Sequence, residues 1–176
     1  MQIETERMTL IPATLPMLRA ELTRPEEFSR LLEAEVASPW PPPLNNEASN
    51  QWMIRQLEQN PETGGWGMWY YLLRRSGGQR PILIGNGGYK GAPTSDGTVE
   101  IGYSIVESYQ RKGLGSEAAR GLVDHAFRDP SVKRVIAETF PHLVPSIGVL
   151  MKNGFHLTGL GSEEGAIQFE LKRKNR

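Results

Sequence analysis

A short segment with two glycines carries the clearest chemical signal in the sequence. Residues 99–106 (Val-Glu-Ile-Gly-Tyr-Ser-Ile-Val) alternate as a strand would, and residues 110–115 (Gln-Arg-Lys-Gly-Leu-Gly) lead into a helical pattern. The start of a helix presents unpaired amides and the positive end of its dipole, so anions bind there readily. Glycines let the backbone approach a ligand closely, and Arg111 and Lys112 add positive charge. The segment therefore predicts an anion site suited to a pyrophosphate.

Two other interpretations of this segment remain open at this point. A turn of this kind also occurs in proteins with no ligand. Gly113, Gly115 and Ala118 match a loose dinucleotide fingerprint, with Glu138 ending the next predicted strand. However, six residues separate Val106 from Gly113, and too few strand–helix units follow for a doubly wound sheet. The glycines are not followed by G-K-S/T, which excludes a nucleotide-hydrolysing P-loop.

The same segment resembles the GNAT N-acetyltransferases. Gln110-x-x-Gly113-x-Gly115 matches their Q/R-x-x-G-x-G/A signature, and residues 138–155 resemble the next block shared by that superfamily. The closest likeness is to the branch of ribosomal-protein N-terminal (alanine/serine) acetyltransferases, for which the opening residues 7–12 are also typical. The likeness is strongest over residues 98–159.

That resemblance implies acetyl-CoA as cosubstrate, held mainly by backbone. Its pantetheine arm would pair with Ile105 and Val106, and amides from Arg111 to Ser116 would hold the pyrophosphate. The residues expected to bind it are Ile105, Val106, Gln110, Arg111, Lys112, Gly113, Leu114, Gly115, Ser116 and Ser146. No metal is expected, because the chain has no cysteine and its histidines lack ligand spacing.

The expected reaction moves an acetyl group to an amine, which must first lose a proton. Glu138 is the first candidate for the base, and an exposed carboxylate at a strand end is the alternative. Glu100 is the second candidate, unless it simply pairs with a cation. The oxyanion needs a donor, for which a backbone amide near Val106 is expected.

Two positions depart from the family pattern. Leu143 stands where many relatives have asparagine, and Leu150 stands where many use a tyrosine as general acid. The role of that tyrosine therefore cannot be carried over to this chain. Ser146 either assists the leaving sulfur or caps the helix that follows.

Hydrophobic periodicity and capping residues predict the elements that position these groups. The expected helices cover 15–22, 47–59 (capped by Asn46), 114 to about 127 and 146–152, with a proline-rich loop at 38–43. The expected strands cover 8–10, 68–73, 82–89, 98–106, 135–139, 155–157 and 167–171. Together with the resemblance they predict a mixed α/β (α+β) fold, one GNAT-type domain over residues 1–176. Its twisted mixed sheet would have roughly six to seven strands and about four helices, splayed between the fourth and fifth strands.

Composition excludes several classes of protein. The 176 residues include 20 acidic and 20 basic side chains, so the basic excess of a general nucleic-acid binder is missing. No signal-like or membrane-spanning apolar run is visible, and the absence of cysteine excludes disulfides. We expect a cytoplasmic monomer or homodimer whose partners are acetyl-CoA and an amine, with neither nucleic acid nor membrane.

The predicted function is transfer of acetyl from acetyl-CoA directly to a primary amine, on a protein N-terminus or a small molecule. Leu143 and Leu150 motivate an alternative, a non-catalytic acyl-CoA-binding or sensing module on the same fold. A partner-binding domain without CoA is disfavoured by the intact glycine turn. The sequence does not identify the acceptor.

Overall fold

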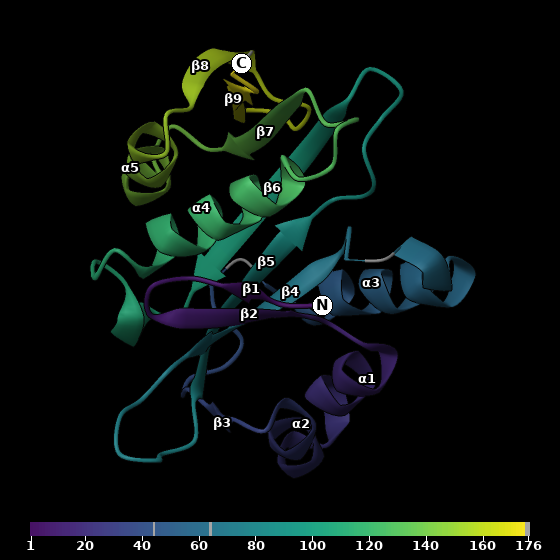
Figure 1. The fold of residues 1–176 in the computed structure, drawn as a ribbon, viewed down its shortest axis with the longest axis vertical. Helices are drawn as coiled ribbons and strands as arrows, with labels where there is room; N and C mark the ends of the chain where they lie inside the picture. Colours follow the sequence, from purple (N-terminus) through teal and green to yellow (C-terminus); the bar gives the residue numbers. More distant parts are fainter. Residues whose placement is uncertain (44, 64, 175–176) are drawn as a thin grey trace.

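A mixed β-sheet forms the centre of the molecule in the computed structural model, which describes residues 1–43, 45–63 and 65–174 (Figure 1). In the described residues the sheet has nine strands in the order β1-β2-β4-β5-β6-β7-β9-β8, and β3 pairs with β5 off this path. The strands are β1 (Ile3–Glu4), β2 (Met8–Pro12), β3 (Glu35–Val36), β4 (Met68–Leu73), β5 (Ile82–Tyr89), β6 (Thr98–Ile105), β7 (Arg134–Thr139), β8 (His156–Leu160) and β9 (Ile167–Lys172).

The sheet opens between β6 and β7. These two strands run parallel, whereas the other neighbours along the path are antiparallel. Only Thr98–Glu100 of β6 pairs with Arg134–Ile136 of β7. Beyond these three pairs both strands continue, β6 to Ile105 and β7 to Thr139, without pairing to each other. This confirms the splay expected between the fourth and fifth predicted strands.

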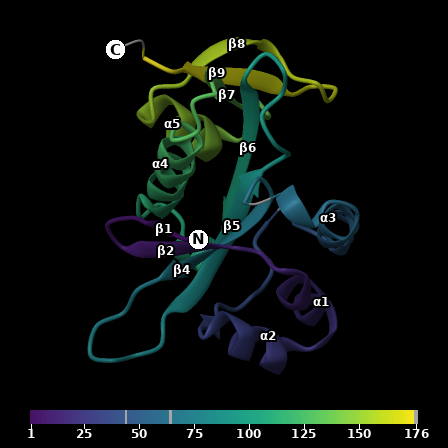
Figure 2. The same cartoon turned by 45° about the vertical axis from the view of Figure 1, so that its right-hand side comes forward.

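Helices cover both faces of the sheet (Figures 1 and 2). Helices α4 and α5 lie on one face, and α1, α2 and α3 lie on the other. Each face has its own buried cluster, one including Ile101, Leu122 and Leu150, the other including Phe28, Tyr70 and Leu83. The helices are α1 (Leu15–Thr23), α2 (Pro25–Leu32), α3 (Glu47–Gln59), α4 (Leu114–Ala126) and α5 (Val144–Lys152). In the described part of the chain, no helix is both long and apolar enough to cross a membrane.

The helix starts that depend on side-chain caps form where the sequence predicts them. Thr14 accepts a hydrogen bond from the amide of Met17 at 3.4 Å, and Asn46 accepts one from the amide of Ser49 at 2.9 Å. Each bond satisfies one of the amides left free at a helix N-terminus. These caps set the positions of α1 and α3.

Helix α4 buries the predicted apolar stripe against β6. Leu114, Ala118, Leu122 and Ala126 are all at most 3% exposed. Residues four apart lie on one face of a helix, so this spacing keeps the whole length of α4 on the sheet. The first turn of α4 is therefore fixed beside the open end of β6.

Three expectations about the elements were wrong. The sheet has nine strands because β1 and β3 each have two residues, too few to show alternation. Helix α2 was missed because its N-cap residue, Arg24, makes no side-chain capping bond and its end at Glu33 lacks the usual glycine. Helix α5 begins at Val144 after Leu143, so Ser146 lies inside its first turn and is not its cap.

The proline-rich loop before α3 is tied to the rest of the fold at two points. Trp40 donates from Nε1 to Oε1 of Glu21 at 2.8 Å. The carbonyl oxygen of Pro43 accepts a hydrogen bond from Oγ of Ser104 at 2.7 Å. The Ser38–Pro39 and Trp40–Pro41 peptide bonds are cis. The loop is thereby held against β6, next to the splay.

Candidate active site

A cavity of about 760 Å³ occupies the splay between β6 and β7. Its walls come from the end of β6, the cradle segment (residues 110–116), the end of β7 and helix α5. The lining residues are Pro43, Ile101, Gly102, Tyr103, Ser104, Ile105, Glu107, Gln110, Arg111, Gly113, Gly115, Ser116, Ala137, Glu138, Thr139, Phe140, Leu143, Pro145, Ser146, Gly148, Val149 and Lys152. The structure thus brings the predicted cradle, Glu138 and Ser146 to one cavity.

The backbone of the cradle segment has the conformation of an anion site. Arg111 and Gly113 have positive φ angles of 57° and 78°. Left-handed residues next to ordinary ones point successive amides into one concavity, which binds anions. Gly113 is also the residue that precedes α4, and no side-chain capping bond is made there. Amides at the start of α4 are therefore available to a ligand.

The two glycines of the cradle are required for different reasons. Gly113 needs its left-handed φ, which other residues adopt only with strain. At Gly115, a β-carbon would lie 3.6 Å from Ile105 and 3.7 Å from Val149, which are ordinary contacts. The fold alone does not require glycine at position 115. Without a β-carbon at this position a phosphate can approach the backbone closely, so the residues present fit the pyrophosphate of CoA.

Side chains hold the cradle against its neighbours. Gln110 donates from Nε2 to the carbonyl oxygen of Ile105 at 2.8 Å, which ties the segment to the end of β6. Lys112 donates to the carbonyl oxygen of Ser108 at 2.9 Å, and its Nζ lies 5.0 Å from the ring centre of Tyr109. Lys112 therefore does not contribute its side chain to the cavity lining.

Two other predicted binding residues are buried in the core. Val106 is 1% exposed and Leu114 is 3% exposed, and neither side chain lines the cavity. The amide of Val106 donates to the carbonyl oxygen of Ile84 at 2.9 Å. That bond occupies the amide of Val106, so the oxyanion donor expected near Val106 would have to be a neighbouring amide.

Glu138 lies on β7 at the cavity wall, with both oxygens hydrogen-bonded. The amide of Ser162 donates to its Oε1 at 2.9 Å, and the hydroxyl of Ser162 donates to its Oε2 at 2.8 Å. Burial acts to raise the pKa of Glu138, but these bonds outweigh it and lower that pKa below its ordinary value. Glu138 is therefore ionised, and able to accept a proton, at neutral pH.

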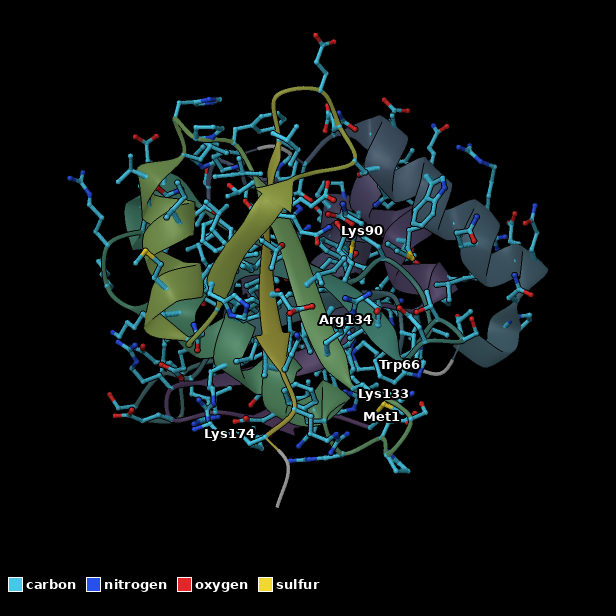
Figure 3. All side chains as sticks on the ribbon, turned by 90° about the horizontal axis from the view of Figure 1, so that it is seen from above. Met1, Trp66, Lys90, Lys133, Arg134 and Lys174 are labelled. Carbon is cyan, nitrogen blue, oxygen red and sulfur yellow. The ribbon has the colours of Figure 1, made fainter. Side chains whose placement is uncertain are left out.

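Glu100 is the last residue of β6 that pairs with β7, and it lies outside the lining of the cavity. It forms an ion pair with Lys90, which agrees with the alternative that it simply partners a cation. Lys90 also acts to lower the pKa of Glu138, so the two carboxylates share one cationic neighbour. Figure 3 shows Lys90 on the side of β7, β8 and β9 opposite α5.

Helix α5 forms one wall of the cavity. Leu150 in this helix and Leu143 just before it are the two positions that depart from the family pattern. Leu150 is fully buried in the core and cannot act as an acid. Ser146 faces the cavity, and so does Tyr103, a residue that was not predicted as part of the site. The signal was present, because Tyr103 lies two residues before Ile105 on the same strand face. Among the described residues there is no group of three His, Cys, Asp or Glu side chains able to hold a metal.

Comparison with known proteins agrees with this geometry. The model of the acetyltransferase (GNAT) domain family matches residues 7–156. The uncharacterized N-acetyltransferase YjdG of Bacillus subtilis (strain 168) is 28% identical over 161 residues, covering 92% of this chain and 93% of that protein. Among solved structures, a putative ribosomal-protein-serine acetyltransferase from Vibrio cholerae is similar with a TM-score of 0.67 at 20% identity, covering 98% of each chain. The L7/L12 alpha-N-protein acetyltransferase RimL in complex with Coenzyme A has a TM-score of 0.68 at 17% identity, again covering 98% of each chain.

A splayed mixed sheet with an anion cradle at the start of α4 suits an acyl-CoA-dependent transferase. The match over residues 7–156 makes the assignment specific: the chain belongs to the GNAT acetyltransferase family. It is an acetyl-CoA-dependent acyltransferase.

Proposed function

We propose that this protein acetylates a primary amine, preferentially the N-terminal amine of a peptide or protein. One observation carries the proposal: a single cavity is lined both by the cradle glycines and by Glu138. Bound acetyl-CoA supplies an acetyl group activated as a thioester. The site therefore places an anion cradle and an ionised carboxylate along one continuous space, which is what transfer to an amine needs.

The cradle and the end of β6 bind and orient. Amides from Arg111 to Ser116 hold the pyrophosphate, while Ile105 lines the wall along which the pantetheine arm runs. The loop carrying Pro43 closes the opposite side through its bond to Ser104. These contacts fix the direction of the cosubstrate and exclude water from part of the cavity.

Glu138 removes the proton that the acceptor ammonium must lose. Only the free amine has a lone pair for attack, and an ionised carboxylate accepts that proton directly or through a water. Glu100 is the weaker candidate, because its ion pair with Lys90 lies outside the cavity lining. Glu100 instead affects Glu138 indirectly, through Lys90, the cation near both carboxylates.

Open space at β6 gives the acceptor a route. A β-carbon placed at Gly102 would meet nothing within 4 Å, although Gly102 lies in the cavity wall. Its neighbours on the same strand face, Glu100 and Ser104, are polar. The similarity to ribosomal-protein acetyltransferases supports a peptide amine as the group that enters here.

The test uses purified protein, acetyl-CoA and a panel of amines. The panel contains short peptides with free N-termini, the same peptides with blocked N-termini and an internal lysine, and a polyamine. Release of free CoA is followed with a thiol reagent, and mass spectrometry locates the acetyl group. We expect acetylation of free N-termini, with Glu138→Gln lowering the rate by roughly 10²–10⁴-fold while acetyl-CoA still binds.

Two outcomes contradict the proposal. Acetylation of the polyamine or lysine alone would assign a different acceptor. Saturable acetyl-CoA binding with no acetylated amine in any arm would support the acyl-CoA-binding module instead. An unchanged rate in Glu138→Gln would remove Glu138 as the base and make Glu100→Gln the next variant to measure.

A further inference from the structure

Two hydroxyl groups meet on facing walls of the cavity. The Tyr103 hydroxyl, on β6, donates to the carbonyl oxygen of Ser146 on α5 at 3.0 Å. The same hydroxyl lies 3.2 Å from Oγ of Ser146. Because the proton of Tyr103 is directed to the carbonyl oxygen, Oγ of Ser146 is the donor in the second contact. Tyr103 thus fixes both the first turn of α5 and the rotamer of Ser146.

This pair is not needed to start the helix. Leu143 precedes α5 and makes no side-chain capping bond, and Ser146 lies inside the first turn. A serine in that position usually bonds to backbone or water. Here Ser146 instead faces a tyrosine across the splay, and both side chains line the cavity.

The order of residues along β6 locates the pair relative to the thioester. The cradle lies after the end of β6, and the wall at Ile105 comes next toward the start of the strand. Tyr103 follows, before β6 meets β7 at Glu100. A pantetheine arm that runs from the cradle past Ile105 therefore carries its sulfur toward Tyr103 and Ser146.

We propose that Tyr103 is a positioning residue that holds the Ser146 hydroxyl to donate a hydrogen bond to the departing sulfur of CoA. The proposal rests on the proposed location of acetyl-CoA in the splay. As the new C–N bond forms and the C–S bond breaks, the electron pair of the C–S bond stays on sulfur. The Ser146 O–H then turns from Tyr103 to this thiolate. The proton lost by the amine goes to Glu138, and the thiolate takes its proton from solvent.

The tyrosine is suited to positioning and not to proton donation. Burial raises the pKa of Tyr103 to about 12, which keeps the hydroxyl protonated across the working range. A thiol titrates several units lower, so transfer of the tyrosine proton to a thiolate is uphill. The pair therefore replaces, by hydrogen bonding alone, the acid that buried Leu150 cannot supply.

The experiment measures the pKa of the CoA thiol on the protein, which requires no acceptor. Ultraviolet absorbance of the thiolate is recorded against pH for bound CoA, with the complex of desulfo-CoA as baseline. We expect the wild-type protein to lower the thiol pKa by on the order of one unit relative to free CoA. Ser146→Ala should abolish that shift and Tyr103→Phe should reduce it, while both variants still bind desulfo-CoA and so provide their own baseline.

A double-mutant comparison separates positioning from general damage. If Tyr103 acts through Ser146, Tyr103→Phe causes no further loss of the shift in a Ser146→Ala background. Tyr89→Phe is the matched control, because the Tyr89 hydroxyl donates to the carbonyl oxygen of Leu122 at 2.6 Å outside the cavity lining. It should lower the melting temperature and leave the thiol pKa unchanged.

The outcomes distinguish this proposal from the proposed function. Binding of CoA and desulfo-CoA with no shift in the thiol pKa overturns the role of Ser146, and with it that of Tyr103, but leaves the proposed function standing. Equal shifts in wild type and Tyr103→Phe overturn the role of Tyr103. A folded wild-type protein that binds neither molecule overturns the location of acetyl-CoA, and this proposal with it.

Discussion

Arg7, in the turn between β1 and β2, donates a hydrogen bond to the carbonyl oxygen of Lys112 in the cradle. Its Nη1 donates to that oxygen at 3.0 Å, and its Nε donates to Oε2 of Glu117 at 2.7 Å. Glu117 lies in the first turn of α4 and also accepts from the hydroxyl of Thr5 at 2.6 Å. The turn between β1 and β2 therefore holds one carbonyl of the cradle and the first turn of α4 in place.

We predict that Arg7→Ala raises the KM for acetyl-CoA about tenfold and changes kcat little. The lost bond from Arg7 orients the cradle, and a misplaced cradle weakens binding before it affects the reacting groups. Initial rates across a range of acetyl-CoA concentrations give both constants.

Arg74→Ala is the control for this variant. Arg74 also binds the turn between β1 and β2, donating at 2.7 Å to the carbonyl oxygens of Thr5, Glu6 and Met8. Within the described residues it makes no hydrogen bond to the cradle. An equal rise in KM for Arg74→Ala would show that Arg7 acts by ordering the turn and not through Lys112.

Gly115→Ala should separate binding from folding. The methyl group makes only ordinary contacts with the protein, so the melting temperature should stay within a few degrees of wild type. The same methyl group would occupy space that the pyrophosphate of acetyl-CoA needs, so acetyl-CoA should bind roughly tenfold more weakly or worse. Calorimetric titration and thermal unfolding measure the two effects.

Gly113→Ala provides the contrast. Its φ of 78° imposes a left-handed conformation, so alanine should cost about 1–2 kcal/mol of folding stability in addition to any loss of binding. If Gly115→Ala lowered the melting temperature as much as Gly113→Ala, the glycine at position 115 would serve the fold and not the ligand.

Local signals made most of the fold predictable. Thr14 and Asn46 cap their helices through their own side chains, and the stripe from Leu114 to Ala126 states the period and the buried face of α4. Such signals lie within a few residues of the structure they specify. Helix α2 was missed because Arg24 makes no side-chain capping bond, although Pro25, Glu26 and Glu27 in its first turn are typical of a helix start.

The parts of the site that were not predicted depend on contacts between distant residues. The pairing of Tyr103 with Ser146 joins a strand to a helix across the splay, and the bonds from Ser162 to Glu138 cross from the segment after β8 to β7. The amide of Val106 is occupied by the carbonyl of Ile84 on a neighbouring strand. No local pattern encodes these partners, so the sequence alone could not predict these contacts.

Ser162→Ala should move the acid limb of the rate profile to higher pH. The hydroxyl of Ser162 helps to lower the pKa of Glu138. Without this hydrogen bond the effect of burial is opposed less, so the pKa of Glu138 rises. If ionised Glu138 is the base, kcat/KM falls as pH drops through that pKa, so raising the pKa shifts the acid limb to higher pH. Rates measured in overlapping buffers test this. An unchanged acid limb in Ser162→Ala would mean that another group titrates in the reaction.

Glu21 makes the stability of the fold depend on pH in an unusual direction. It accepts hydrogen bonds from Trp40 at 2.8 Å, Asn50 at 2.7 Å and Tyr70 at 2.5 Å. Burial raises the pKa of Glu21 despite these bonds. The folded state therefore holds this proton at pH values where the unfolded chain, with a pKa of about 4.3, has lost it.

The consequence is a contribution to stability that is fully present below the unfolded pKa and is lost as pH rises through the folded pKa. Most other shifted carboxylates, including Glu117 and Glu138, have lowered pKa values and contribute in the opposite sense. The contribution of Glu21 is therefore obtained by comparing wild type with Glu21→Gln. The free energy of unfolding of both proteins is measured between pH 4 and pH 7, a range that begins near the reference pKa of roughly 4.3.

We expect Glu21→Gln to be less stable than wild type by about 1–3 kcal/mol at every pH, because its amide NH₂ is a donor and faces a donor where the carboxylate oxygen accepted a hydrogen bond. The deficit should shrink as pH rises, since the wild type alone loses the stability of the protonated carboxyl. Tyr70, the titratable group in contact with Glu21, stays neutral throughout because burial raises its pKa well above the ordinary value. A deficit that grows with pH would show that Glu21 is stabilised as the anion and would reverse the direction assigned to its pKa.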